Sequence, residues 1–141
     1  MSRQVIKLGL ALIGCCIITM PLYAYPLKNL WLTPDQQGKV LLDQRKPLLA
    51  AERFQNLMWK GVAYYRAKQY QKAVDVFKQL DSPLAFYNLG NALSHLGEYQ
   101  QAIWAYNQTL KKNPNFADAK FNRDLLEKLI KNQTSKQSSS S

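Results

Sequence analysis

The sequence predicts an all-α fold in which about three helical hairpins stack into a solenoid and a further helix closes the carboxyl-terminal end. Three observations predict this fold. Glycine, alanine and aromatic residues recur in a fixed register, prolines stand at or just before expected helix starts, and the last apolar residues recur at helical spacing. No strands are expected.

A constant register relates the stretch 61–77 to the stretch 90–106. In each stretch a glycine is followed by a tyrosine, an alanine and a second aromatic residue. A third copy lies upstream of the first in a shorter register, and together the matches indicate an internal repeat. The matching sets are Gly61, Tyr70, Ala73 and Phe77, then Gly90, Tyr99, Ala102 and Tyr106 (90 − 61 = 29), and upstream Gly38, Ala50 and Phe54 (61 − 38 = 23).

Each copy reads as two helices joined by a short turn. The glycine lies in the first helix, and the alanine and the aromatic residue lie one turn apart in the second. We expect the small residues to mark a close approach of two helix backbones, and the aromatic side chain to fill the wedge between one hairpin and the next. Because one hairpin cannot bury its apolar face alone, the copies must stack.

The pattern predicts seven helices in chain order. Pro83 stands at a predicted helix start, where its missing N–H costs little, and Pro114 lies just before another. Phe121, Leu125 and Leu129 recur at helical spacing and predict a final helix that caps the solenoid. The predicted helices are 34–44, 47–54, 56–67, 70–80, 83–96, 99–111 and 116–131.

The two ends of the chain differ in composition from the repeat region, which spans residues 26–131. Residues 132–141 hold no large apolar side chain and end in four serines, so they are predicted to form a disordered tail. Residues 1–25 form a separate amino-terminal segment. Arg3 and Lys7 precede an apolar run from Leu8 to Tyr23, as in a secretory signal or a membrane anchor.

Three alternatives remain open for the amino-terminal segment. The chain could be cleaved after Ala24 as a signal peptide, or the run could stay in the membrane as a transmembrane helix. The stretch ending in Cys15 also resembles a bacterial lipobox, which would place a lipid on that thiol. In each case the remainder of the chain is expected in the periplasm, either exported or membrane-associated.

Residues 83–116 resemble the tetratricopeptide repeat nearly position by position. The resemblance departs at Thr109, where a small alanine is usual. It divides the repeat region into copies at 33–54, 55–82 and 83–116, with a cap at 117–131, and implies a scaffold for protein binding. The positions that carry it are Phe86, Leu89, Gly90, Leu93, Gly97, Tyr99, Ala102, Tyr106 and Pro114.

A wider likeness covers roughly residues 27–130. The runs 30–38 and 58–67 look like the periplasmic repeat segment of bacterial Bat-type (aerotolerance) proteins. Those proteins often join this segment to a von Willebrand factor A domain, near a MoxR-type ATPase. The present sequence has no Asp-x-Ser-x-Ser metal-adhesion motif and no room for that domain. The likeness therefore implies a repeat module alone, with such a domain as a possible protein partner.

Composition and charge narrow the classes of function. The net charge of +10 favours anionic partners, so binding to the cell wall or to an anionic membrane surface is the second hypothesis. The basic residues are scattered and carry no nucleic-acid signature, which argues against nucleic-acid binding. Beyond Cys15 and Cys16 there is no cysteine, and no nucleophile–base pair, metal-ligand cluster or phosphate loop is found. We expect no enzyme activity, no metal and no cofactor.

The first helices of stacked hairpins line an inner groove, and their polar and aromatic residues are the candidate partner-binding site. Amides on such a face can hydrogen-bond the backbone of a ligand, while tyrosine and tryptophan supply rigid contact area. Nearby positions in the same helices should project into the same groove. The candidates are Trp59, Tyr65, Arg66, Asn88, Asn91, His95 and Asn122.

Overall fold

The computed structural model describes residues 31–138, and this part of the chain folds into seven α-helices without a strand. The fold prediction is confirmed. Each helix begins within one residue of its predicted start, and all but the last end within three residues of the predicted end. The predictions for residues 1–25 concern a segment that lies outside the described residues. The helices are α1 Pro34–Asp43, α2 Pro47–Arg53, α3 Leu57–Arg66, α4 Tyr70–Phe77, α5 Pro83–His95, α6 Tyr99–Lys112 and α7 Ala117–Ser138.

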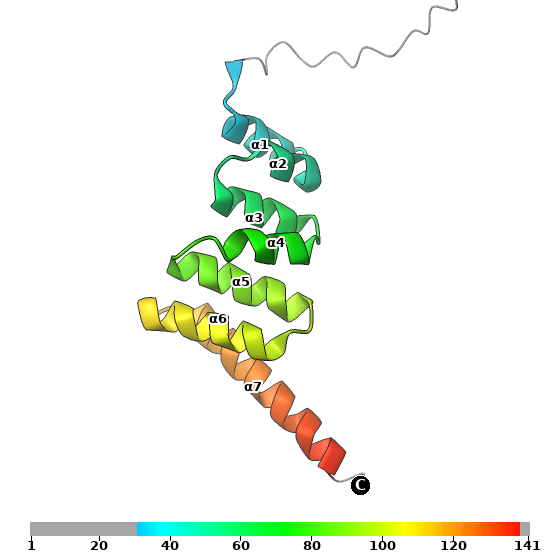
Figure 1. Ribbon diagram of the computed structural model, residues 1–141, viewed down its shortest axis with the longest axis vertical. Helices are drawn as coiled ribbons and strands as arrows, with labels where there is room; N and C mark the ends of the chain where they lie inside the picture. Colours follow the sequence, from blue (N-terminus) through cyan, green and yellow to red (C-terminus); the bar gives the residue numbers. More distant parts are fainter. Residues whose placement is uncertain (1–30, 139–141) are drawn as a thin grey trace, which may run out of the picture.

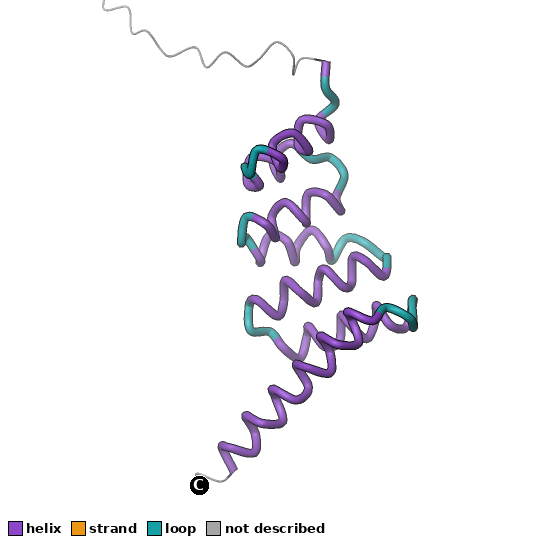
Figure 2. The backbone as a smooth tube through the Cα atoms, turned by 180° about the vertical axis from the view of Figure 1, so that it is seen from behind, coloured by secondary structure: helices purple, strands orange, loops and turns teal. Residues whose placement is uncertain are grey.

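The helices form three antiparallel hairpins that stack in chain order. The pairs are α1 with α2, α3 with α4, and α5 with α6, and each hairpin packs on the next (Figure 1). Helix α7 packs against α6 at the far end of the stack, and Figure 2 shows the same order from behind. As a result α1 and α7 lie at opposite ends of an elongated body, as a solenoid requires.

The helix boundaries follow from local sequence chemistry. Thr33 begins α1 with a capping box, because its hydroxyl accepts from the Gln36 backbone while the Gln36 side chain accepts from the Thr33 backbone. Ser82 caps α5 with its hydroxyl, which accepts from the backbone N–H of Ala85. Proline occupies the first turn of α1, α2 and α5, where a missing N–H leaves no bond unmade.

The turn inside each hairpin uses a residue with positive φ at the same repeat position. These residues are Arg45 at 58°, Lys68 at 58° and Gly97 at 77°. They follow the two registers of the repeat (68 − 45 = 23, 97 − 68 = 29). Only the third hairpin places glycine there, which accommodates this conformation without strain.

The repeated glycines lie beneath the repeated aromatic rings of the same hairpin. A Cβ on Gly90 would stand 2.5 Å from Cε1 of Tyr106, and one on Gly61 would stand 2.5 Å from Cε1 of Phe77. The first hairpin repeats this contact between Gly38 and Phe54, at 2.9 Å. The sequence interpretation was therefore wrong in one respect. The glycine makes room for a ring within its own hairpin, rather than for a neighbouring helix backbone, and the ring is not simply a wedge between hairpins.

Helix α7 closes the stack with a charged face. In α5 four positions form the side toward α6, and three of these residues are buried. The residues of α7 that lie 34 positions further along the chain are all charged. Because burying these charges against an apolar surface would be costly, another helix could not pack there as α6 packs on α5. The α5 residues are Phe86, Leu89, Gly90 and Leu93, and their counterparts in α7 are Lys120, Arg123, Asp124 and Glu127 (120 − 86 = 34).

Helix α7 differs from its prediction in length and in the face that it buries. It continues to Ser138, so residues 132–138, which were expected to be disordered, are helical. Once a helix is nucleated, each further residue adds a hydrogen bond at little cost, and the Thr134 hydroxyl also donates to the Ile130 carbonyl. The helix packs through Ala119 and Leu126. The apolar residues that identified this helix in the sequence are instead exposed: Phe121 by 67 %, Leu125 by 54 % and Leu129 by 37 %.

Within residues 31–138, none of the helices combines the length and the apolar character that crossing a membrane requires.

Candidate functional site

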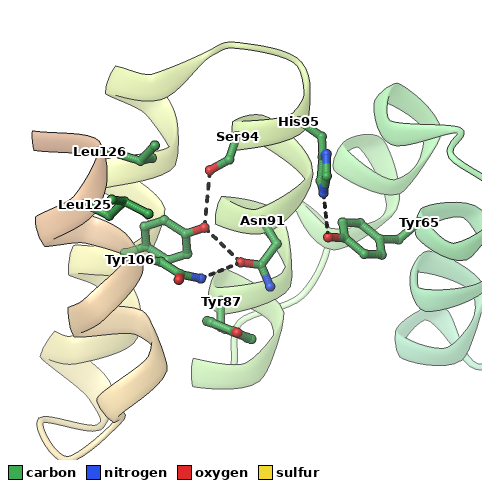
Figure 3. A pocket seen from close by; sticks show the side chains of 9 residues that line it. Tyr65, Tyr87, Asn91, Ser94, His95, Tyr106, Leu125 and Leu126 are labelled. Carbon is green, nitrogen blue, oxygen red and sulfur yellow. Dashed lines mark hydrogen bonds between the residues drawn. The ribbon is translucent and has the colours of Figure 1, made fainter. Parts of the chain in front are cut away.

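A pocket of about 390 Å³ opens where the first helices α3, α5 and α7 come together beside α6. We call it the α5–α7 pocket. Its walls combine hydroxyl, amide and imidazole groups with leucine side chains (Figure 3). It is lined by Tyr65, Tyr87, Asn91, Ser94, His95, Tyr106, Asn122, Leu125 and Leu126.

A hydrogen-bond network at the centre of the pocket fixes Asn91. The Tyr106 hydroxyl donates to Asn91 Oδ1 at 2.8 Å, and Asn122 Nδ2 donates to the same oxygen at 3.1 Å (Figure 3). The Ser94 hydroxyl lies 3.2 Å from the Tyr106 hydroxyl and donates to the Gly90 carbonyl. Both acceptor sites of the Asn91 oxygen are therefore used by the protein.

The same network leaves two amide groups available. Within residues 31–138, neither the Asn91 amino group nor the Asn122 side-chain oxygen makes a hydrogen bond to the protein. One group is a donor on α5 and the other is an acceptor on α7. A peptide backbone offers the complementary acceptor and donor, so the pocket can bind a chain segment without any charged group.

Tyr65 and His95 form the edge of the pocket toward α3, and Tyr70 packs behind them. His95 Nε2 lies 2.9 Å from the Tyr65 hydroxyl, and the His95 ring stacks on Tyr70 with ring centroids 4.4 Å apart. Burial raises the pKa of Tyr65 above its ordinary value, and the neighbouring Tyr70 and Tyr87 raise it further. These contacts hold Tyr65 as a neutral hydroxyl beside the pocket.

Burial also raises the pKa of Tyr106, while the polar side chains of Ser94 and Asn122 beside its hydroxyl act in the opposite direction and lower the pKa. Because the folded chain favours the neutral phenol, the stability from this group is complete below the ordinary pKa of 10.0 and is lost as the pH rises through the folded pKa. We expect Tyr106→Phe to abolish this component of alkaline destabilisation. Above pH 10 the parent chain should lose up to about 1.4 kcal/mol per pH unit relative to the variant.

The measurement is urea unfolding of both chains at pH 8 and at pH 11. The seven other tyrosines are shared and cancel in the comparison. If the difference in free energy of unfolding between the parent chain and Tyr106→Phe is the same at both pH values, the pKa of Tyr106 is not raised in the folded chain.

The structure brings four of the seven predicted site residues together in this pocket: Tyr65, Asn91, His95 and Asn122. The three others lie elsewhere. Asn88 Nδ2 contacts the Met58 sulfur at 3.6 Å, which is a bond between neighbouring hairpins. Trp59 stacks on Phe54, with ring centroids 6.1 Å apart. Arg66 is exposed beside a different pocket, formed with Leu42, Arg45 and Pro47.

The periodicity of a helix explains this division. Tyr87, Asn91, Ser94 and His95 are spaced as i, i+4, i+7 and i+8, so they share one face of α5, whereas Asn88 is rotated away from it. Extending that spacing backward from Asn91 would have found Tyr87. No sequence signal placed Tyr106, because it reaches the pocket from the second helix of the hairpin.

The pocket offers neutral hydrogen-bonding groups to a ligand. Among residues 31–138, no group of three or more His, Cys, Asp or Glu side chains could hold a metal ion. The single histidine of the chain is engaged with Tyr65 and Tyr70. What the pocket presents to a ligand is amide and hydroxyl hydrogen bonding beside the exposed side chain of Leu125.

Comparison with known protein families identifies the repeat. Two family models, each described as tetratricopeptide repeat, match the chain, one over residues 83–116 and the other over residues 55–82. These are the residues predicted for the third and second copies. Among curated proteins, no sequence matches this chain. The resemblance to Bat-type proteins therefore gains no support from a relative.

Tetratricopeptide repeats are typically non-catalytic adaptors that bind protein partners.

Proposed function

We propose that this chain is a non-catalytic scaffold of the bacterial cell envelope, which holds a segment of a partner protein in the α5–α7 pocket. The observation that carries the proposal is the pair of available amide groups, the donor of Asn91 and the acceptor of Asn122. A peptide group can satisfy both, while Leu125 and Tyr87 offer apolar area to its side chains. Repeats of this family bind protein partners in general, which supports a protein segment as the ligand.

The envelope location rests on the amino-terminal sequence pattern. Arg3 and Lys7 ahead of the apolar run would stay cytoplasmic, and the repeat domain would then lie in the periplasm. Protease treatment of spheroplasts tests this arrangement, because periplasmic residues 31–138 would be digested while a cytoplasmic protein stayed intact. The mass of the mature chain separates a cleaved, a retained and a lipidated segment.

The partner that the sequence resemblance suggests is a membrane protein with a von Willebrand factor A domain. In this proposal a separate polypeptide supplies that domain. The proposal predicts that the two proteins copurify from solubilised membranes, and that the neighbouring gene encodes the second protein or a MoxR-type ATPase.

Amide substitutions test the pocket directly. Asn91→Ala and Asn122→Ala should each lower the affinity for the partner by about three- to tenfold, because each removes a hydrogen bond worth about 0.5–1.5 kcal/mol. The partner is first identified by pulldown from membranes with the parent chain, and binding of that purified partner is then measured by calorimetry.

Two matched variants serve as controls for these substitutions. Asn88→Ala changes a first-helix amide outside the pocket, and Asn107→Ala changes an exposed amide on α6. Neither should alter partner affinity. If all four variants bind equally well, or if the controls lose as much affinity as the pocket variants, the partner does not use the α5–α7 pocket.

The net charge of +10 supports a second candidate function, binding to anionic cell-wall polymers or lipid headgroups. Such binding would depend on long-range charge and would weaken steeply between low and physiological salt, since exposed charges are screened over about 10 Å at 0.1 M. Binding through uncharged amides would change little. A salt titration with anionic vesicles and with the purified partner therefore separates the two functions.

A further inference from the structure

The exposed stripe of α7 consists of Phe121, Leu125 and Leu129 and runs along one face of the helix at intervals of four residues. Its members occupy the repeat positions of Tyr87, Asn91 and His95, so the stripe continues the pocket-lining face of α5 to the end of the stack (121 − 87 = 34). Three large apolar side chains exposed together at the end of a solenoid are typical of a surface that binds another protein surface and is thereby removed from water. A further repeat cannot provide it, since the side of α7 that would meet one is charged.

The charges along α7 are arranged to complement a second, antiparallel α7. Residues 117–127 carry three acidic and two basic side chains, a net charge of −1, and Arg123 pairs there with Asp124 and Glu127, which leaves Asp118 as the acidic residue outside that cluster. Every charged residue after Glu127 is a lysine, at positions 128, 131 and 136. Asp118 and Lys136 are separated by five full helical turns (136 − 118 = 18), so they share the face of the stripe and flank it at either end.

We propose that two copies of this chain associate through antiparallel pairing of their α7 stripes, about a two-fold axis near Glu127. In this arrangement Leu125 of each copy meets Leu129 of the other, and Asp118 of each lies opposite Lys136 of the other. The four leucines form the apolar centre of the contact, and Phe121 packs against the aliphatic part of Gln133 from the second copy.

The shape of the body permits this pairing. The carboxyl-terminal half of α7 projects beyond α6 and away from the stacked hairpins (Figures 1 and 2). In an antiparallel pair this projecting half lies along the stripe of the other copy, and the two bodies sit at opposite ends of the paired helices. The interface is isologous, so it closes at two copies and does not propagate into a filament.

Charge reversal tests the pairing and its direction together. In Asp118→Lys both end pairs become lysine with lysine, and in Lys136→Asp both become aspartate with aspartate. Each variant alone should raise the dimer dissociation constant on the order of tenfold. An equimolar mixture of the two variants restores both opposite-charge pairs, and should associate as the parent chain does.

The measurement is sedimentation velocity of the full chain in a mild detergent, in which any contribution of the shared amino-terminal segment is the same for every variant. Lys131→Asp is the matched control, since it makes the same charge change away from the stripe and should sediment with the parent chain. Leu125→Glu, which places a charge among the four leucines, should sediment as a monomer.

The inference is overturned if the parent chain sediments as a monomer, if Leu125→Glu leaves the mass unchanged, or if the mixture associates no better than its components. It concerns self-association and goes beyond the proposed function, although Leu125 belongs to both surfaces. The two proposals fail separately. If Asn91→Ala binds the partner as well as the parent chain does, the pocket assignment is wrong, whether or not the chain dimerises. If the parent chain sediments as a monomer, the pairing is wrong, whatever its affinity for the partner.

Discussion

Gly90→Leu is expected to cost about 3 kcal/mol of folding free energy, near the upper end of what overpacking a core causes. A Cβ alone at this position would stand 2.5 Å from a carbon of the buried Tyr106 ring, and leucine adds three further carbons. The ring cannot move aside freely, because its hydroxyl bonds Asn91 and contacts Ser94. In thermal unfolding followed by circular dichroism, the midpoint should fall by roughly 12–24 °C.

Two variants separate steric overlap from other effects of the Gly90 substitution. Gly90→Ala should already be destabilising, although alanine is favoured over glycine in a helix by about 1 kcal/mol. Asn107→Leu introduces the same side chain on the exposed face of α6 and should shift the midpoint little. A Gly90→Leu chain that melts with the parent chain would contradict the observed contact between glycine and ring.

Tyr106→Ala is expected to cost about 3–5 kcal/mol, because it removes a large side chain that is 1 % exposed and leaves a cavity above Gly90. Tyr106→Phe keeps the ring and removes only the hydroxyl, so it should cost about 1 kcal/mol at neutral pH. Urea unfolding of both variants divides the contribution of packing from that of hydrogen bonding.

The ratio of these two losses in the Tyr106 variants is the informative result. If Tyr106→Phe loses as much stability as Tyr106→Ala, the hydrogen bonds of the hydroxyl stabilise the hairpin and the packing of the ring on Gly90 contributes little. A loss below about 1 kcal/mol for Tyr106→Ala would mean that the site collapses around the missing ring.

The sequence was a good guide to the helices because local signals and the repeat agree. Thr33, Asn56 and Ser82 cap their helices where the pattern places helix starts, and the repeated glycines and aromatic residues lie in contact as one register requires. The partner of each aromatic ring was misjudged. A repeat shows that two positions are linked, but it does not say whether they meet inside a hairpin or across two.

The last helix was the hardest element to predict, since its apolar residues are the exposed ones. Spacing identifies a helix and its apolar face, but not whether that face meets the body. In α7 the small Ala119 and Leu126, two turns further on, provide the packing, while Phe121, Leu125 and Leu129 stay exposed and Leu125 borders the α5–α7 pocket. Its extension to Ser138 depends on propagation from a packed first half, which composition alone does not reveal.

The sequence predicted only part of the candidate site, since a repeat places residues on a helix but does not fix which way each side chain turns. Asn122 was found through its repeat register with Asn88, and Asn91, His95 and Tyr65 were found because they lie near the same inner face. Asn88 was included because it stands two residues before the repeated Gly90. Each step along a helix turns the side chain by about 100°, so Asn88 does not share the face of its neighbour Tyr87. Its amide instead bonds Met58 on the preceding hairpin.

The measurement that tests this account most directly is a nuclear Overhauser experiment on the repeated glycines. The contact between glycine and ring sets the geometry of each hairpin, and through it the positions of the α5–α7 pocket and the α7 stripe. We predict cross-peaks from the α protons of Gly38, Gly61 and Gly90 to the rings of Phe54, Phe77 and Tyr106 respectively, with the glycine signals shifted upfield by the rings. Glycine α protons at ordinary shifts, with no cross-peak to these rings, would contradict the account.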